Sequence, residues 1–516
     1  MTTGKSRAGH RAKPDHDALV TVLGGNALVE TDAERRQATR QPSRRAASPY
    51  LARSVLRRHW LAVALLTAGL VLRVLAQLAY RPALFYIDSV KYIFDAQGND
   101  PEGYKAPLRA ILLVANFNTV TAIQHLLGLA MAVVIYVLLR RRGVSRWLAA
   151  LAIAPVLLDA YQLQQEQTIM PTTWFEALIV TALAILLWQP SLGWRRVVAA
   201  GLVLGTSATV AQVGESLILP AVIFLLAAGG GWRQATAKAA VLCAAFVLPI
   251  LAYCTGSYLI TGTFALSHQG VTSLYGRTAA TVDCARIRLP AAERAVCPTR
   301  VQQAKGDDWL SFNPASPVQA DYRHLPRAQV DSVVTSFNNS VLTQQPLRVL
   351  DAYGRDVFKL FAVTRHTAPG DPPITRWQFQ TAFPYFTPHA SKQQITAVVD
   401  QFGGGRPAVW RPVADFLHHY QVDGGYTPGP LLALLSVAGL LGAAVALLAR
   451  RLDQRTRQIA LACLLFFGSA LFLLLASDLF VFSWRYQLPA LVTLVPAGAL
   501  GLHVIADLMR SRRTPA

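Results

Sequence analysis

The chain has 516 residues, of which 53% are hydrophobic and only 15% are charged, and its formal net charge is +21. The charged residues lie at the ends of long apolar runs, a distribution that excludes a soluble globular enzyme and is typical of a membrane protein. The positive charge lies in short loops rather than in a basic groove with interleaved aromatic residues, which argues against a nucleic-acid-binding protein.

The first apolar run follows a long basic tail. Residues 1–58 are rich in arginine, polar and without apolar periodicity, and they show no cleavable signal peptide. We expect them to form a disordered tail in the cytoplasm, where their charge also favours contact with anionic lipids. The run from His59 to Tyr80 is long enough to cross about 30 Å of hydrocarbon as an α-helix.

Successive apolar runs predict an all-α polytopic fold with about ten membrane-spanning helices. In chain order the runs cover residues 59–80, 118–139, 147–158, 172–188, 196–211, 217–230, 236–258, 428–449, 458–477 and 487–508. They form two groups, residues 59–258 and residues 428–508, and a basic tail, residues 509–516, follows the last helix.

Residues 259–427, between the seventh and eighth predicted helices, are polar and contain no apolar run of membrane length. We expect a mainly helical domain here, and the stretch 344–363 places apolar residues at mostly helical spacing. That stretch could lie against the membrane, cover a site or pack as part of a cap. Cys284 and Cys297 fall in this domain and could form a disulfide if it faces an oxidising compartment.

The basic loops indicate the orientation. If the N-terminus is cytoplasmic and successive spans cross the membrane in alternate directions, all basic loops lie in the cytoplasm, as the positive-inside rule requires. These loops are 140–146, 194–196, 232–238, 450–457 and 510–513. The C-terminus is then cytoplasmic too, and the outer face carries the polar segments 85–110, 159–171, 259–427 and 478–486. We therefore expect a protein of the cell membrane whose site opens outward.

The first outer loop, residues 81–117, holds the first candidates for chemistry. Asp88 lies between Tyr86 and Tyr92 just past the first helix, where it could act as a general base or cap a short helix. Three cations share the loop: Lys91, Lys105 and Arg109. Each could bind a phosphate or contact lipid headgroups.

Further charged residues lie near the membrane. Arg485, between Trp484 and Tyr486, could bind a lipid phosphate or belong to an interfacial aromatic belt. Arg73 lies inside the first helix, so it should face the bundle interior or reach toward the interface. Glu166 lies between the third and fourth helices, where a carboxylate needs a partner or a role.

Two classes of site find no support in the sequence. No histidine spacing resembles a zinc site, although His418 and His419 are adjacent. There is no glycine-rich phosphate loop, which argues against an ATP-driven pump.

Together these features resemble the GT-C class of membrane glycosyltransferases, within it the group similar to polyprenyl-phosphate-sugar-dependent protein mannosyltransferases of actinobacteria. The resemblance covers about residues 59–508 and rests on FYIDSVKYIFDAQG and PEGYKAPLRAIL after the first helix, EQTIMPTTWFEAL entering the fourth, and WRYQLPALV late in the chain. In that family an acid of the first outer loop is the base, and an arginine near the last outer loop helps to bind the carrier phosphate. By position, Asp88 and Arg485 take these roles.

One feature departs from the family pattern. Many members carry two adjacent acids in the first outer loop, whereas Asp88 is followed by Ser89. Glu166 is the weaker match for the second acid.

The resemblance implies an enzyme that moves a sugar, mannose first and arabinofuranose next, from a polyprenyl-phosphate donor to an acceptor hydroxyl on the outer face, with inversion. A phosphate leaving group needs cationic stabilisation rather than a nucleotide site. The implied donor-phosphate residues are Arg485, Lys91, Lys105 and Arg109, and the substrate-pocket residues are Tyr86, Tyr92, Glu166, Trp484 and Tyr486. The implied partners are the lipid-linked donor, a secreted or cell-envelope acceptor and the bilayer. The resemblance fixes no cofactor and leaves metal dependence open, since some enzymes of the class use a divalent metal ion.

Two other functions compete with this interpretation. A transporter or lipid flippase would show internal repeats and charged residues along mid-helix paths. A scaffold protein would need neither Asp88 nor Arg485. If those two residues lay more than about 15–20 Å apart with no shared cleft, the enzyme interpretation would lose its main support.

Overall fold

The structure is a computed structural model that describes residues 57–94, 101–228, 230–267, 270–320, 324–387, 390–449 and 452–513. The chain divides into two units, Met1–Arg58 and His59–Ala516. The predicted disordered tail coincides with the first unit, and its residues 1–56 lie outside the described residues. The helices and the candidate site belong to the second unit.

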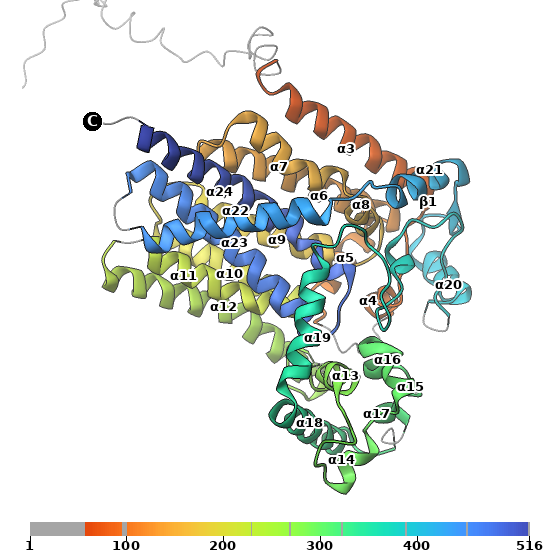
Figure 1. Cartoon of the computed structure of the whole chain (residues 1–516). Helices are drawn as coiled ribbons and strands as arrows, with labels where there is room; N and C mark the ends of the chain where they lie inside the picture. The colour runs from red at the N-terminus through yellow and green to blue at the C-terminus, as the bar shows by residue number, and fades with distance from the viewer. Residues whose placement is uncertain are drawn as a thin grey trace, which may run out of the picture. The chain divides into compact units, whose positions relative to one another are not determined.

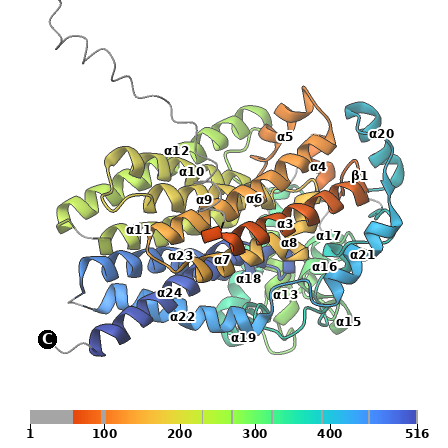
Figure 2. The same ribbon diagram turned by 90° about the horizontal axis from the view of Figure 1, so that it is seen from above.

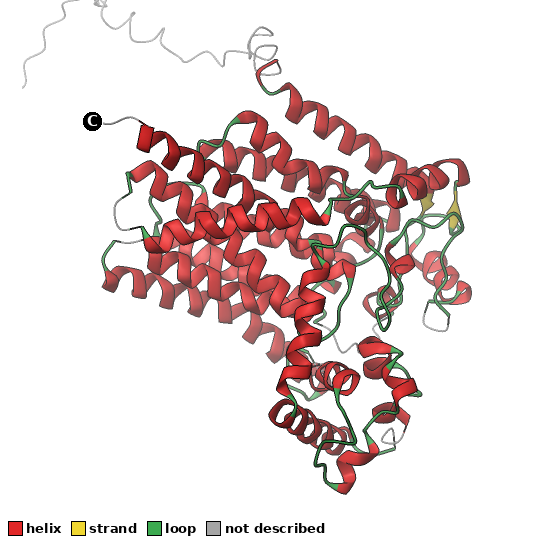
Figure 3. Cartoon of the chain, in the orientation of Figure 1, coloured by secondary structure: helices red, strands yellow, loops and turns green. Residues whose placement is uncertain are grey.

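The second unit is an all-α polytopic membrane protein, as the sequence predicts (Figures 1 and 3). Each predicted span corresponds to one helix: α3 (Trp60–Ala79), α6 (Phe117–Arg141), α7 (Arg146–Leu158), α9 (Thr172–Leu187), α10 (Trp194–Val210), α11 (Ile218–Ala228), α12 (Trp232–Thr261), α22 (Gly429–Leu448), α23 (Gln454–Asp478) and α24 (Pro489–Arg513). The last helix continues to Arg513, past residue 509 where the sequence predicts a tail.

Six segments in the described part of the chain are long and apolar enough to cross a membrane: α3, α6, α12, α22, α23 and Trp484–Arg510. A seventh arises if α7 and α8 (Ala160–Gln167), which meet at a bend of 49°, form one broken span. The helices between 172 and 228 are shorter. At 1.5 Å per residue the 16 residues of α9 extend about 24 Å, less than a typical hydrocarbon core.

Helix caps explain where several spans begin. The Asn116 side chain accepts a hydrogen bond from the Thr119 backbone N–H at the start of α6. At the start of α23, the Asp453 carboxylate accepts from the N–H groups of Arg455 and Thr456. These contacts satisfy N–H groups that have no partner within the helix.

Glycines allow the closest helix pairs to form. A Cβ atom added at Gly501 of α24 would lie 2.0 Å from the Ala438 carbonyl oxygen of α22. One added at Gly205 of α10 would lie 2.1 Å from the Phe246 carbonyl oxygen of α12. Small residues let helix backbones approach closely inside membranes. Figure 2 shows α10 beside α12 and α22 beside α24.

The stretch 159–171, for which the sequence predicts a polar outer loop, is mostly helical and buried in the structure. It contains α8, and every side chain of that helix is buried. The reason is that its glutamines bond to neighbouring segments: the Gln167 side-chain amide donates to the Tyr80 carbonyl, and that of Gln162 donates to Glu176. A polar helix can be buried when its side chains find partners.

The polar segment between α12 and α22, residues 262–428, is mainly helical, as the sequence predicts. Its elements are α13 (Gly270–Thr281), α14 (Ala291–Ala295), α15 (Arg300–Gln303), α16 (Gly306–Phe312), α17 (Pro317–Ala320), α18 (Arg327–Gln344), α19 (Pro346–Lys359), η2 (Ile374–Trp377), α20 (Lys392–Phe402), β2 (Ala408–Val409) and α21 (Arg411–Val422). Helix α19 falls in the stretch 344–363 with helical apolar spacing.

The polar segment has two parts (Figure 1). Helices α13 to α19 surround a separate apolar core that includes Tyr275 and Phe337. The later part packs against the membrane helices, where β2 pairs antiparallel with β1 (Tyr80–Arg81), the strand that follows α3. Cys284 and Cys297 are joined in a disulfide at the edge of the first core, with their Cα atoms 6.2 Å apart.

Removing this disulfide is expected to destabilise the part of the protein formed by α13 to α19. The bond joins residues 13 positions apart, and a crosslink of this size contributes about 3 kcal/mol in the chain-entropy account. Cys297→Ser should therefore lower the midpoint of thermal unfolding of the purified protein and expose this part to limited proteolysis. Cys243→Ser, at a free cysteine, is the control. An unchanged proteolysis pattern in Cys297→Ser would contradict the expectation.

Candidate functional site

The first loop is held in place by the backbone that follows α8. The Leu84 N–H donates to the Gln167 carbonyl, and the Ile169 N–H donates to the Leu84 carbonyl. The Ser89 hydroxyl donates to the Ile169 carbonyl and accepts from the Tyr86 N–H. This bonding explains why the chain turns here and fixes the short helix α4 (Ser89–Ile93).

Asp88 immediately precedes α4 but does not cap it. Its carboxylate accepts no hydrogen bond from a backbone N–H of that helix. Instead, Oδ1 lies 2.9 Å from the Lys91 Nζ, and Oδ2 lies 3.3 Å from the Arg485 Nη1. Its side chain is 20% exposed. The geometry therefore disfavours a capping role and leaves the carboxylate directed at two cations.

Arg485 belongs to η3 (Trp484–Gln487), the short turn before α24. Its guanidinium lies over the rings of Trp377 and Tyr486, at 4.9 Å and 4.8 Å from their centroids. Nη2 also donates to the Tyr486 hydroxyl at 3.1 Å. Aromatic faces attract a guanidinium, so these rings hold a cation whose side chain is only 11% exposed.

The two cations keep Asp88 ionised. Burial by itself would raise the pKa of the Asp88 carboxyl, but Lys91 and Arg485 outweigh burial and leave that pKa below its usual value. At neutral pH the carboxylate can therefore accept a proton. Its basicity is reduced for as long as both cations stay beside it.

Arg485 lines a cavity of about 180 Å³ at the ends of membrane helices. Apolar lining groups come from the ends of α9, α10 and α23 and from the residues that follow them, among them Phe175, Val210, Val213, Phe480 and Val481. Helices α13 and α16 close the cavity with Ser273, Asp308 and Phe312. The cavity thus combines an apolar wall with a buried guanidinium.

A second ion pair continues the cluster. The Arg376 Nη1 lies 3.1 Å from the Asp308 Oδ2 and 3.4 Å from the Tyr86 hydroxyl. The Trp377 ring lies between the Tyr86 ring, at 4.5 Å between centroids, and the Arg485 guanidinium. The sequence analysis missed Arg376, Trp377 and Asp308, because no motif marks them in the long polar segment.

The structure separates the remaining candidates into two groups. Tyr92 and Tyr486 line the cavity with Arg485, while Tyr86 lies beside it in contact with Arg376. Trp484 does not line the cavity; its indole N–H donates to the His366 carbonyl. Lys105 and Arg109 lie on α5 (Lys105–Leu112) and do not line the cavity. Lys105 pairs with Glu102, which precedes the helix, and Arg109 is exposed.

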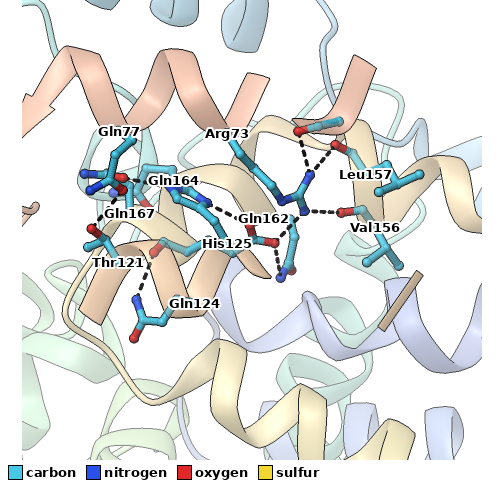
Figure 4. A network of polar contacts seen from close by, with 12 residues as sticks. Arg73, Gln77, Thr121, Gln124, His125, Val156, Leu157, Gln162, Gln164 and Gln167 are labelled. Carbon is cyan, nitrogen blue, oxygen red and sulfur yellow. Dashed lines mark hydrogen bonds and ion pairs between the residues drawn. The ribbon is translucent and has the colours of Figure 1, made fainter. Parts of the chain in front are cut away.

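Glu166 belongs to a different cluster, with Arg73 and His125. Figure 4 shows the network of polar contacts around these two labelled residues. The Glu166 Oε1 lies 2.7 Å from the Arg73 Nη2, and its Oε2 lies 3.0 Å from the His125 Nδ1. Arg73 also donates to the backbone carbonyls of Val156 and Leu157. Glu166 therefore does not line the cavity with Arg485, and partners on α3 and α6 account for its burial.

Potential metal ligands do not cluster in the part of the chain that the structure describes. No three His, Cys, Asp or Glu side chains in that part of the chain gather as a metal site. Both adjacent histidines bond to backbone carbonyls, His418 to that of Phe379 and His419 to that of Asp415.

Comparisons with known proteins identify no family for this chain. No protein-family model matches the chain, and no curated protein matches it. Among solved structures, the archaeal oligosaccharyltransferase AglB from Archaeoglobus fulgidus, in complex with an inhibitory peptide and a dolichol-phosphate, matches with a TM-score of 0.39 and 14% sequence identity. The match covers 89% of this chain and 52% of the AglB chain, so this chain spans about half the length of AglB. A similarity at this level does not bear on function.

Proposed function

We propose that this protein is an integral membrane glycosyltransferase that moves a sugar from a polyprenyl-phosphate donor to an acceptor hydroxyl. The observation that carries the proposal is the 3.3 Å contact between the Asp88 carboxylate and the Arg485 guanidinium, which lines a cavity at the ends of membrane helices. An isoprenoid chain suits the apolar wall, a phosphate suits the guanidinium, and an acceptor hydroxyl suits the carboxylate.

In this proposal Arg485 binds the donor phosphate, and Lys91 assists it. A guanidinium can donate two parallel hydrogen bonds to one phosphate, and the rings of Trp377 and Tyr486 orient it. Lys91, next to Asp88, provides a second positive charge. Lys105 and Arg109 are given no part: Lys91 pairs with Asp88, whereas Lys105 pairs with Glu102 and Arg109 is exposed on α5.

Transfer then proceeds by direct displacement. The acceptor oxygen attacks the anomeric carbon while Asp88 takes the hydroxyl proton, and the bond from that carbon to the phosphate oxygen breaks. The phosphodiester becomes a phosphate monoester with one more negative charge, which Arg485 and Lys91 stabilise. Attack from the face opposite the leaving group inverts the anomeric centre.

The ion pair also connects donor binding to base strength. In the structure, Asp88 forms ion pairs with both Arg485 and Lys91. A donor phosphate competes for the same donors, so its binding draws Arg485 away from Asp88. Loss of that cation raises the pKa of Asp88 toward its usual value and makes it a better base once the donor is bound.

The proposed location is the outer face of the cell membrane, with both termini in the cytoplasm. Arginines of two basic loops contact the ends of the helices that precede two others: Arg142 donates to the Leu187 carbonyl of α9, and Arg457 donates to the Ala227 carbonyl of α11. Asp88, Arg376 and Arg485 meet in a separate cluster. The positive-inside rule favours the cytoplasm for the basic loops, and the cluster with Asp88 then faces outward. Mannose is the first sugar to test and arabinofuranose the second.

A direct assay tests the proposal. The detergent-purified protein is incubated with polyprenyl-phosphate-mannose or decaprenyl-phosphate-arabinose, and release of the polyprenyl phosphate is followed. We expect release from one donor, dependent on Asp88. If neither donor binds the protein, the proposal is wrong.

Arg485→Lys gives a second test. Lysine keeps the charge but loses the planar fork and the stacking on Trp377 and Tyr486. We expect binding of polyprenyl phosphate to weaken by about tenfold to a hundredfold, the range for losing one charged hydrogen bond. Arg355→Lys, at an exposed arginine of α19, is the matched control. Equal affinity in Arg485→Lys and the wild type would contradict the role of Arg485.

A transporter or lipid flippase is the second candidate. The buried charges of α3, α6 and α8 favour it, because ionisable residues inside membrane helices often mark transport paths. However, Arg73, Glu166 and His125 pair with one another, and their side chains are no more than 7% exposed. Movement of a lipid-linked sugar across liposomes, without release of the sugar, would support this candidate instead.

A further inference from the structure

The cavity beside Arg485 offers two kinds of polar group. Among the described residues that line it, Arg485 is the only cation. The other lining side chains that can form hydrogen bonds are neutral or acidic: Tyr92, Thr172, Gln212, Ser273, Asp308, Ser477 and Tyr486. The cavity therefore offers a guanidinium to a phosphate and several hydrogen-bonding groups to neutral hydroxyls.

Asp308 is the acid among these lining groups. It lies on α16, in the polar segment, and its side chain is 32% exposed, more than the 20% of Asp88. Oδ2 is held 3.1 Å from the Arg376 Nη1. A carboxylate has about four acceptor positions, so this single contact leaves room to accept from a ligand.

Arg376 keeps Asp308 in position. One nitrogen of its guanidinium bonds both to Asp308 and to the Tyr86 hydroxyl. The Tyr86 ring packs against Trp377, which in turn lies under Arg485. The acid and the proposed phosphate-binding arginine thus belong to one connected cluster, although they come from different parts of the fold.

We propose that this cavity binds the neutral sugar ring of the lipid-linked donor, with Asp308 accepting hydrogen bonds from its hydroxyls and Arg376 positioning Asp308. This inference rests on the proposed function. With the donor phosphate bound at Arg485, the remaining polar groups of the cavity, Asp308 among them, are left for the sugar. A sugar that lacks a hydroxyl bound by a charged acceptor loses more affinity than a sugar that lacks one apolar contact, so such an acceptor discriminates sugars more strongly.

Binding measurements with and without the sugar test the inference. The ligands are polyprenyl phosphate, which lacks the sugar, polyprenyl-phosphate-mannose and decaprenyl-phosphate-arabinose, added to the wild type, Asp308→Ala and Asp308→Asn. For the donor that the wild type prefers, Asp308→Ala should weaken binding about tenfold to a hundredfold. Its affinity for polyprenyl phosphate should remain within about twofold, since no hydrogen bond to the phosphate is lost. Asp308→Asn keeps one acceptor oxygen and should show a smaller loss.

Controls separate the possible failures. Asp351→Ala, at an exposed ion-paired aspartate of α19, should leave all affinities unchanged. The sugar subsite is wrong if Asp308→Ala weakens polyprenyl phosphate and the sugar donor equally, or if it weakens neither. Absence of binding of all three ligands to the wild type would instead overturn the proposed function, and the subsite with it. Arg376→Lys should reproduce the selective loss in part, because it keeps the charge but not the fork.

Discussion

Asp88→Asn is expected to lower the rate of sugar transfer by about 10²–10⁴-fold, the usual contribution of a general base. The substitution keeps the shape of the side chain and removes the carboxylate that would take the acceptor proton. The measurement is release of polyprenyl phosphate from the preferred donor, together with the thermal unfolding midpoint of the variant. We expect that midpoint to stay near that of the wild type, because Asp88 is partly exposed and caps no helix.

The same variant should bind polyprenyl phosphate more tightly than the wild type does. Asp88 competes with the phosphate for Arg485 and Lys91, so its neutralisation frees both donors. We expect an increase of about threefold to tenfold, a modest value because the ion pair is partly solvated. Tighter binding with lost transfer would distinguish a base from a residue that merely holds the site together.

A control in the same loop completes the test. Glu102 pairs with Lys105 at the same i,i+3 spacing as Asp88 with Lys91. Glu102→Gln should therefore leave both transfer and binding unchanged. If Asp88→Asn kept more than about a tenth of the wild-type rate, Asp88 would not be the base.

The second large effect concerns the buried pair of Arg73 and Glu166. Glu166→Gln leaves the Arg73 guanidinium buried without a counter-charge, and breaking a buried ion pair in this way costs about 3–5 kcal/mol. We expect a lower yield of monodisperse protein and a lower thermal unfolding midpoint in detergent. Thr343→Ala, at an exposed threonine of α18, serves as the reference.

A double variant separates stability from function at this pair. Replacing Arg73 by Met in the Glu166→Gln background removes the unpaired charge and should recover part of the lost stability. Because Glu166 does not line the cavity, molecules that fold should retain transfer. A Glu166→Gln protein that folds as well as the wild type but has no transfer activity would instead assign Glu166 a functional role.

Much of the membrane architecture follows from composition along the chain. Each long apolar run became a helix, because a backbone in hydrocarbon must satisfy its own hydrogen bonds. The mainly helical nature of residues 262–428 also follows from local patterns such as the amphipathic stretch of α19. The exception is 159–171, where polarity predicts an outer loop and the structure buries α8. Local polarity does not reveal whether distant partners will satisfy a side chain.

Asp88 and Arg485 were singled out from the sequence alone, as an acid and an arginine beside membrane helices and by resemblance to a family. Their contact could not be read from the chain, since the two residues are 397 positions apart. The sequence also could not show whether the Asp88 carboxylate caps a helix or is directed at other side chains. The structure does so, because the carboxylate of Asp88 accepts no backbone N–H of α4 and pairs with the side chains of Lys91 and Arg485 instead.

The sequence by itself determined the class of the protein, the positions of its helices and the residue types suited to bind a phosphate. Hydrophobicity and charge are local quantities, and the bilayer acts on them directly. Only the tertiary structure decided which charges lie together: it joined Asp88 to Arg485, paired Asp308 with Arg376, and left Glu166 with Arg73. Such partnerships depend on long-range packing, in which segments far apart in the chain bring their side chains to one place.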